Sequence, residues 1–251
     1  MVQNRAGRLL IRVLLVVCTL TWWVLPGFGL IDLGVTWDPD WPVMLEAGWG
    51  LLFTVGVGLP FLVVAIRPGL AKAGLAQLYV VTAALVVGAV VGLEPQAWWI
   101  FVMLLLEVPL IFAIAPSTRL QRGRTQAPLL ALAVVATPPA LIYAWDMADL
   151  NRLGLPNSDI TNFVNHYAVQ AALALALIAL PAVAAMWPDT QRLLGTSTAL
   201  MAGYLGLVSY FWPGELGGFS AEWSVAVMVW AAAVLAATWW PPGMQRKGKH
   251  S

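Results

Sequence analysis

Charged side chains are scarce in this chain of 251 residues: Asp, Glu, Lys and Arg make up only 10% of it, whereas a typical soluble domain has about 25%. Hydrophobic residues make up 61%, and the mean hydropathy is +0.81. One water-soluble globule could not hide that much apolar surface, so the composition predicts an integral membrane protein with the lipid bilayer as its main partner. The formal net charge of +1 argues against nucleic acid as a partner, because that role needs a concentrated basic face.

Cysteine and histidine are also rare: the chain has one cysteine, Cys18, and two histidines, His166 and His250. A single cysteine excludes an intrachain disulfide and any metal site built from several cysteines. Two histidines, one of them in the C-terminal tail, exclude a bis-histidine haem or a His-box di-iron site within the spans. No predicted span contains a lysine for a retinal Schiff base, and neither a His-Glu-x-x-His nor a Gly-x-x-x-x-Gly-Lys motif occurs. We therefore expect no metal and no cofactor.

Long apolar runs are what the chain has in abundance. A helix needs about 20 apolar residues to cross the hydrocarbon core, and only helices or closed barrels satisfy their backbone hydrogen bonds there. The runs are too long for barrel strands and lack their alternation. We predict an all-α bundle of eight transmembrane helices that forms a single domain over residues 1–251. The predicted spans are 11–31, 43–66, 75–93, 97–115, 127–145, 168–187, 193–212 and 223–240.

The positive charges set the orientation, because cytoplasmic loops of membrane proteins carry an excess of Lys and Arg. With eight spans and a cytoplasmic N-terminus, all of the 13 Lys and Arg except Arg152 lie in inner segments or at an inner helix end. This map places both termini in the cytoplasm. The composition, rich in Ala, Gly, Val, Pro and Arg, suits a GC-rich bacterial genome, so we expect the bacterial inner membrane. We expect the first span to stay uncleaved, because no small-residue cleavage site follows it and the apolar run continues to Ile31.

Glu107 lies near the centre of the span 97–115, where an ionised carboxylate is costly and the neutral acid is favoured. Its neighbours one and two turns away on the same helix are all apolar, so a partner must come from another helix. Polar residues predicted at a similar depth are Thr54, Thr137 and Tyr204. We predict from these four residues a midplane proton or ion site. The alternative is structural: a neutral Glu107 that hydrogen-bonds across helices.

Glycine and proline gather in two spans at about the same depth. The second span holds Gly48, Gly50, Gly56, Gly58 and Pro60, and the fifth holds Pro138-Pro139. Proline frees backbone carbonyl groups, and interrupted helices beside a buried acid are common in transporters. The spacing Gly88-x-x-x-Gly92 in the third span instead predicts a packing groove.

A second polar feature begins in the outer loop 146–167. Asp159 is predicted to start a helix as its N-cap, and helical spacings of three, four and four then connect Asp159, Asn162, His166 and Gln170. On an α-helix these side chains form one stripe that runs from the outer water into the sixth span. The stripe predicts an outer polar site that faces protein or a water-filled cavity. The alternative is a capped helix entrance whose polar groups only contact water.

Three functions stay open at this point. The first is a transporter-like carrier of a small solute, coupled to protons, with Glu107 and the outer stripe on one pathway. The second is a non-catalytic subunit or scaffold that binds another membrane protein. The third is a membrane-embedded enzyme that uses His166 with outer carboxylates on a lipid-linked or extracytoplasmic substrate. A continuous polar cavity from His166 toward Glu107 favours the first, a dry bundle the second, and a His166–carboxylate pocket open to lipid the third.

Overall fold

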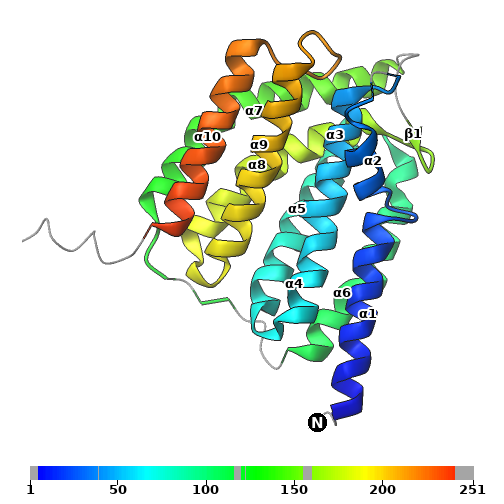
Figure 1. Ribbon diagram of the computed structural model, residues 1–251, viewed down its shortest axis with the longest axis vertical. Coiled ribbons are helices and arrows are strands. Elements are labelled where there is room, and N and C mark those ends of the chain that lie inside the picture. Colours follow the sequence, from blue (N-terminus) through cyan, green and yellow to red (C-terminus); the bar gives the residue numbers. More distant parts are fainter. Residues whose placement is uncertain (1–4, 39, 116–119, 122, 155–159, 241–251) are drawn as a thin grey trace, which may run out of the picture.

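The computed structural model describes residues 5–38, 40–115, 120–121, 123–154 and 160–240. In this part of the chain, eight helices are long and apolar enough to cross a membrane, and they pack side by side into one bundle (Figure 1). The prediction of an all-α bundle is confirmed to this extent. The membrane-length helices are Arg5–Trp23, Val43–Ile66, Pro68–Gly92, Pro95–Ile114, Ala127–Leu153, His166–Met186, Pro188–Phe211 and Ala221–Trp239.

Several of these spans are made of consecutive segments. The second consists of α3 (Val43–Leu51), a π-helix η1 (Leu52–Gly58) and α4 (Leu59–Ile66). Three others begin with a one-turn 3₁₀-helix that has proline first: η2 (Pro68–Leu70) before α5 (Ala71–Gly92), η3 (Pro95–Ala97) before α6 (Trp98–Ile114), and η4 (Pro188–Thr190) before α9 (Gln191–Phe211). Proline suits this position because the first amide of a helix has no intrahelical acceptor. The remaining spans are α1 (Arg5–Trp23), α7 (Ala127–Leu153), α8 (His166–Met186) and α10 (Ala221–Trp239).

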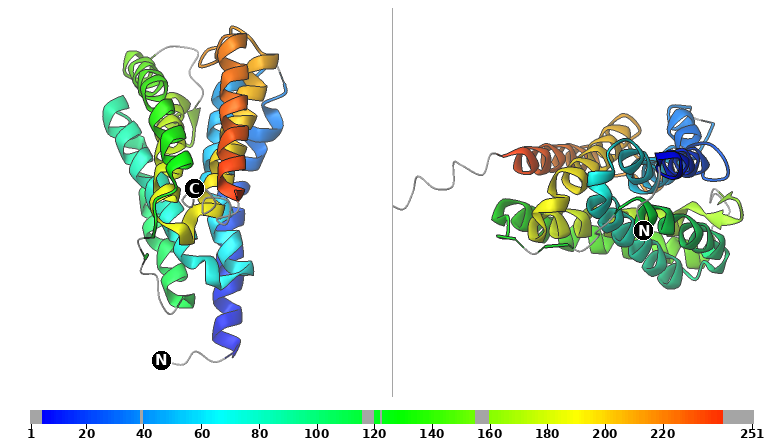
Figure 2. Two further views of the ribbon diagram at one scale, coloured as in Figure 1. Left: turned by 90° about the vertical axis from the view of Figure 1, so that its left-hand side faces the viewer. Right: turned by 90° about the horizontal axis from the view of Figure 1, so that it is seen from below.

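The first span is where the predicted boundaries are wrong. A continuous helix over 11–31 was expected, but α1 ends at Trp23 and a separate short helix, α2 (Gly29–Val35), follows it. Pro26 has no amide to donate, and Phe28 has a φ of 57°, which no right-handed helix allows. α1 itself lies at the edge of the bundle, and its N-terminal half extends beyond the other helices (Figures 1 and 2).

Helix α8 is the centre of the packing, because it contacts α3, α5, α7 and α9 and most of its side chains are buried. Small residues bring α5 close to it. A Cβ added at Gly88 would lie 2.6 Å from the carbonyl oxygen of Ala168, and one at Gly92 would lie 3.5 Å from the Cβ of the same alanine. The packing groove predicted from Gly88 and Gly92 is therefore confirmed, with α8 as the helix that fills it.

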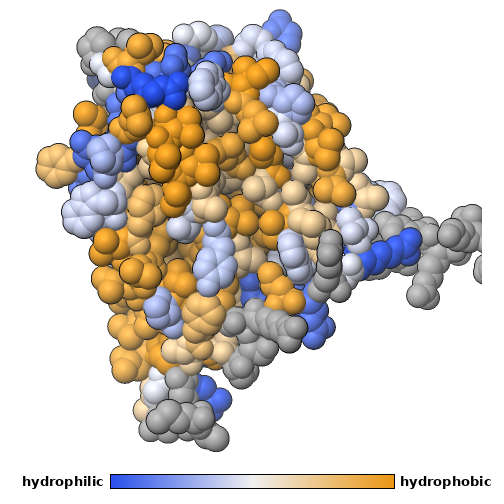
Figure 3. Space-filling view, turned by 180° about the vertical axis from the view of Figure 1, so that it is seen from behind, coloured by the Kyte–Doolittle hydropathy of each residue, from blue (hydrophilic) through white to orange (hydrophobic). Residues whose placement is uncertain are grey.

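The outward-facing side chains are largely apolar. Leu105 on α6 is 74% exposed, Val135 on α7 is 70% exposed and Val229 on α10 is 63% exposed. Apolar residues cover most of the face in Figure 3, while strongly hydrophilic ones gather toward its two ends. Such a surface fits a bundle that is surrounded by lipid tails rather than water.

The two ends of the bundle differ in charge. Because successive spans alternate in direction, the described cations Arg5, Arg8, Arg12, Arg67, Lys72, Arg124 and Arg192 lie at one end, here called the arginine-rich end. Lys72 forms an ion pair there with Asp189 at 3.3 Å. Among the described cations only Arg152 lies at the opposite end. We call this the carboxylate-rich end, because it holds Asp32, Asp38, Asp40, Glu46, Glu94, Asp146, Asp149, Glu215 and Glu222.

Candidate functional site

The break between α1 and α2 leaves backbone carbonyls that no helix satisfies, and side chains from other elements bind them. The indole Nε1 of Trp49, on α3, donates to the carbonyl oxygen of Gly27 at 2.7 Å. The amide of Asn162 donates to the carbonyl oxygen of Pro26 at 2.6 Å. Open carbonyls within a bilayer are tolerated only when protein or trapped water binds them, so these two contacts hold the break in place.

The π-helix η1 is supported in the same way. A π-helix is wider than an α-helix, and single turns of it often mark functional sites. Trp23 donates from its indole to the carbonyl oxygen of Thr54 at 2.9 Å. Gln77, fully buried on α5, donates to the carbonyl oxygens of Val55 at 2.7 Å and Gly56 at 3.2 Å. The glycine-rich second span thus forms a π-helix whose carbonyls are bound by two neighbouring spans.

The two interruptions meet. A Cβ added at Gly29, the first residue of α2, would lie 2.6 Å from the hydroxyl oxygen of Thr54. At a rise of about 1.5 Å per residue, Thr54 lies about 16 Å along its span from Val43, close to half the thickness of a hydrocarbon core. The hydroxyl of Thr54 is buried and has no hydrogen-bond partner among the described residues. We call this contact between the α1–α2 break and η1 the interrupted layer.

Glu107 lies beside this layer and is 8% exposed. Its carboxylate accepts a hydrogen bond of 2.5 Å from the indole Nε1 of Trp22, the residue before Trp23 on α1. The partner that the sequence required from another helix is therefore a tryptophan. The indole donor can serve the carboxylate as well as the neutral acid, because an acceptor oxygen exists in both forms.

An aromatic column, formed by Trp22, Phe53, Trp49 and His166, runs from Glu107 to the start of α8. Trp22 stacks on Phe53 with ring centroids 5.3 Å apart, and Phe53 contacts Trp49 at 4.6 Å. Trp49 in turn stacks on the imidazole of His166 at 4.5 Å and 20°. All four rings are fully buried, so packed aromatic rings fill the space between His166 and Glu107.

The other two residues predicted at the depth of Glu107 have different surroundings. Thr137 donates to the carbonyl oxygen of Ala133 within its own helix, at 2.8 Å. Tyr204 donates to the carbonyl oxygen of Leu33 on α2 at 3.2 Å and accepts a hydrogen bond from the indole of Trp37 at 3.0 Å. Of the predicted midplane set, Thr54 belongs to the interrupted layer and Glu107 lies beside it, whereas Thr137 and Tyr204 are bound elsewhere.

The helical stripe predicted at the outer site is wrong in its first part. Residues Ile160–Thr161 (β1) and Val164–Asn165 (β2) form a small antiparallel hairpin in which Ile160 is opposite Asn165. Asn162 and Phe163 form its turn with φ of 50° and 69°, as a two-residue hairpin requires.

Helix α8 begins only at His166, because the side chain of Asn165 caps it by accepting from the amide of Tyr167 at 3.0 Å. β-Branched residues on both sides of an asparagine were the overlooked signal. Asp159 lies outside the described residues.

His166 and Gln170 share one face of α8, as predicted, and both are fully buried. The imidazole Nε2 of His166 lies 2.9 Å from the hydroxyl of Thr161 on the hairpin. The amide nitrogen of Gln170 donates to the hydroxyl of Tyr143 at 2.7 Å. Its amide oxygen lies against Gly48, so a Cβ added at Gly48 would overlap that oxygen. Gly48 therefore lets α3 and α8 approach closely around a buried amide.

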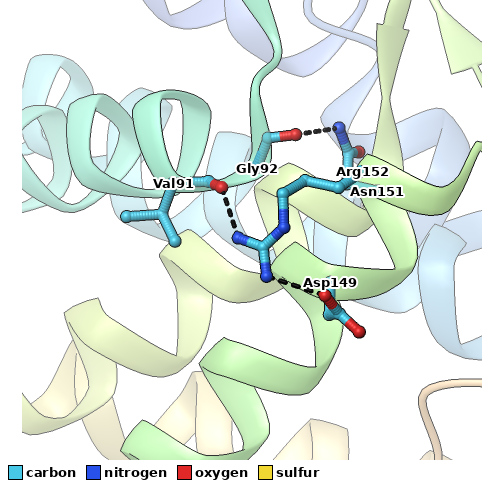
Figure 4. A network of polar contacts seen from close by, with 5 residues as sticks. All are labelled: Val91, Gly92, Asp149, Asn151 and Arg152. Atoms are coloured by element: carbon cyan, nitrogen blue, oxygen red, sulfur yellow. Dashed lines mark hydrogen bonds and ion pairs between the residues drawn. The ribbon is translucent and has the colours of Figure 1, made fainter.

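The isolated cation Arg152 has a structural role at the carboxylate-rich end (Figure 4). Its guanidinium donates to the carbonyl oxygen of Val91 at 2.7 Å and pairs with Asp149 at 2.8 Å, while Asn151 donates to the carbonyl oxygen of Gly92 at 3.0 Å. These carbonyls end α5, where a cation is favourable. Arg152 thus joins the C-terminal ends of α5 and α7, and the carboxylate of Asp149 is bound to it.

A cavity of about 930 Å³ opens at the arginine-rich end between α4, α5, α9 and α10. Ser197 lines it and donates to the side-chain oxygen of Gln77 at 2.9 Å. Since Gln77 also binds the carbonyls of η1, two hydrogen-bonding steps connect the cavity wall to the interrupted layer.

Sequence reasoning missed three residues around the interrupted layer, which are Trp22, Trp49 and Gln77. It also missed Asn151, which binds the C-terminal end of α5. Gln77 carried a signal, because it is an amide inside an apolar span. The tryptophans did not differ in sequence from ordinary core residues. Among the described residues, no group of three or more His, Cys, Asp or Glu side chains could hold a metal ion.

Comparison with protein-family models, curated proteins and solved structures gave no match.

Proposed function

We propose that this protein is a small-solute carrier in which the interrupted layer is the central barrier and Glu107 is the proton-binding group. The observation that carries the proposal is the meeting of two broken spans, the α1–α2 break and η1, at about half the depth of the bundle. Carriers commonly place their binding sites at such discontinuous helices, because a helix broken at mid-depth can change its geometry without unfolding.

The cavity supports the same reading. It reaches from the arginine-rich end to Ser197, whose partner Gln77 binds the carbonyls of η1. A carrier that is open to one side has this form: a solvent-accessible vestibule on one side of a closed layer. The layer is closed toward the other side by α2, whose first residue packs on Thr54.

A membrane scaffold is the second candidate, and the aromatic column favours it. Four buried rings occupy the space between His166 and Glu107, and a bundle that never opens would keep them packed. The two functions differ in one measurable property: a carrier exposes the interrupted layer to each side in turn, and a scaffold does not.

Thiol accessibility tests this difference. Cys18 is the only cysteine, so single cysteines can be introduced at Thr54 and at Thr196 in a Cys18→Ala background. A charged, membrane-impermeant methanethiosulfonate is then added to either side of vesicles that contain the full chain. We expect position 196, which lines the cavity, to react from the arginine-rich side, and position 54 to react from both sides, because a carrier exposes the layer to each side in turn.

The matched control is Ala231→Cys, which lies on α10 and is 3% exposed. It should not react from either side. If position 54 is as unreactive as position 231 from both sides, the carrier proposal is wrong and the scaffold is favoured.

Glu107→Gln tests the proton-binding group. The amide oxygen can still accept from Trp22, so the variant should fold, but it cannot exchange a proton and should abolish proton movement. A pH-sensitive dye in proteoliposomes under gradients of small carboxylates, amino acids and sugars measures this. Equal proton flux in wild type and variant would exclude Glu107 as the relay.

A further inference from the structure

The cavity at the arginine-rich end carries an excess of positive charge. Arg67 and Arg192 line it, together with Asp189. Asp189 is already paired with Lys72, and within the described part of the chain neither arginine forms an ion pair with a carboxylate. Two arginines therefore line the cavity without a described carboxylate bound to either of them.

One of these arginines is held in place by its neighbours. The guanidinium of Arg192 lies over the ring of Trp239, 5.1 Å from its centroid. The indole Nε1 of Trp239 donates to the hydroxyl of Thr196 at 3.2 Å. Arg192, Trp239 and Thr196 all line the cavity, so the cation is fixed on an aromatic face at its wall. A guanidinium fixed in this way loses less side-chain freedom when it binds an anion.

The remaining polar wall consists of neutral groups. Thr196 contributes a hydroxyl on α9, and Gln126 and Gln191 contribute amides, whereas the hydroxyl of Ser197 is already bound to Gln77. Hydroxyl and amide groups next to arginine are suitable partners for phosphate and carboxylate oxygens. The volume of about 930 Å³ is within the range of small-molecule sites.

We propose that this cavity binds an anionic group, a phosphate or a carboxylate, through Arg67 and Arg192. The inference rests on the proposed function in one respect: if the protein is a carrier, an anion bound here is its class of cargo. The same chemistry has two sources, a soluble anion from the water phase or the phosphate of a lipid headgroup that enters from the side, and the experiment has one arm for each.

The first arm uses soluble anions. The melting temperature of the purified full chain in an uncharged detergent is followed with increasing sodium phosphate or sodium succinate, against sodium chloride at the same ionic strength. A ligand that binds only the folded state raises the melting temperature with its concentration. We expect such a rise, and we expect Arg67→Gln and Arg192→Gln each to weaken binding about tenfold, which corresponds to about 1.4 kcal/mol.

The second arm uses lipid. The protein is extracted from vesicles of phosphatidylglycerol and phosphatidylcholine, and retained lipid is counted by native mass spectrometry. If the anion is a lipid phosphate, phosphatidylglycerol stays bound to the wild type and is lost in Arg67→Gln and Arg192→Gln, while soluble anions give no rise in melting temperature. The control in both arms is Arg124→Gln, an exposed arginine at the same end that does not line the cavity.

Binding in either arm that depends on Arg67 and Arg192 but not on Arg124 supports the proposal. No binding in either arm, or an equal loss in Arg124→Gln, overturns it. The thiol-accessibility test needs no anion, so the two ideas fail separately: a cavity that binds anions beside an unreactive position 54 refutes the carrier alone, and the reverse result refutes the anion site alone.

Discussion

Irregular backbone occurs in the first two spans, here called the N-terminal part of the bundle, and not in α7 and α8, here called the C-terminal part. In the N-terminal part, the chain breaks between α1 and α2, and the second span contains its π-helix in a stretch without proline. In the C-terminal part, α7 contains Pro138 and Pro139 and still runs unbroken from Ala127 to Leu153, and α8 does the same around Pro181. Proline content alone therefore does not decide where a membrane helix breaks.

The difference lies in what surrounds the irregular backbone. Around the interruptions, Trp23, Trp49, Gln77 and Asn162 from other turns and elements donate to the open carbonyls. In α7 such contacts are fewer: Thr137 binds the carbonyl of Ala133 in its own helix, and Trp230 of α10 donates to the carbonyl oxygen of Leu132 at 3.0 Å. A break at mid-depth persists where donors from neighbouring segments bind its carbonyls, because lipid offers none.

The largest effect is expected from Gly27→Ala, at the break itself. A Cβ there would overlap the backbone of Trp22, which cannot rotate away as a side chain can. We expect a loss of about 3 kcal/mol in the free energy of unfolding, at the upper end for an overpacked site. SDS-titration unfolding followed by circular dichroism measures it. Gly34→Ala is the control, because nothing lies within 4 Å of its Cβ, and it should be neutral or slightly stabilising; equal losses in both variants would refute the tight break.

Gln77→Leu should cost about 2–3 kcal/mol, because it leaves the carbonyls of Val55 and Gly56 and the hydroxyl of Ser197 without their partner. The same unfolding assay applies. In addition, the amide protons of η1 should exchange faster in the variant. If the free energy of unfolding falls by less than about 0.5 kcal/mol, as for an ordinary surface substitution, η1 does not depend on Gln77.

Trp22→Phe tests the contact with Glu107 while a ring still stacks on Phe53. We expect a loss of about 1–2 kcal/mol, because the buried carboxyl group loses its donor. In a Glu107→Leu background the same substitution should have a much smaller effect, and the double-mutant cycle measures the coupling. Additive losses would show that the hydrogen bond contributes nothing.

Thr137→Val, in the unbroken part, should change stability by less than about 0.5 kcal/mol. Its hydroxyl binds only the carbonyl of Ala133 in the same helix, and the valine keeps the shape of the side chain. Unfolding in SDS, run beside Gln77→Leu, provides the comparison. A loss as large as that of Gln77→Leu would remove the distinction between the two parts of the bundle.

Hydropathy was sufficient to predict eight helices of membrane-spanning length, since a run of about 20 apolar residues has few alternatives in a folded chain. The second span was predicted as 43–66 and observed as Val43–Ile66. The groove at Gly88 and Gly92 followed from the small residues themselves. The orientation stays a prediction from charge, and the host membrane stays a prediction from composition.

The errors occurred where a local pattern had two meanings. The spacing of Asn162 and His166 fits a helix, yet the β-branched residues around Asn162 form a hairpin. When residues are counted along each span, Thr137 and Tyr204 lie at the same depth as Glu107. Depth does not show which face of a helix contacts which neighbouring helix, and both side chains bind elsewhere. Glu107 was recognised as a residue that needed a partner, and Trp22 could not be named because the sequence does not say which helices touch.

The sequence by itself determined that the chain is a bundle of apolar helices with cationic residues at one end, because the transfer of side chains and charges between water and lipid depends on their own chemistry. Only the tertiary structure decided that two helices break at one level, that Trp22 meets Glu107, and that two arginines line one cavity. Those features depend on which side chains supply hydrogen bonds to a neighbouring backbone, and that depends on the packing of distant segments.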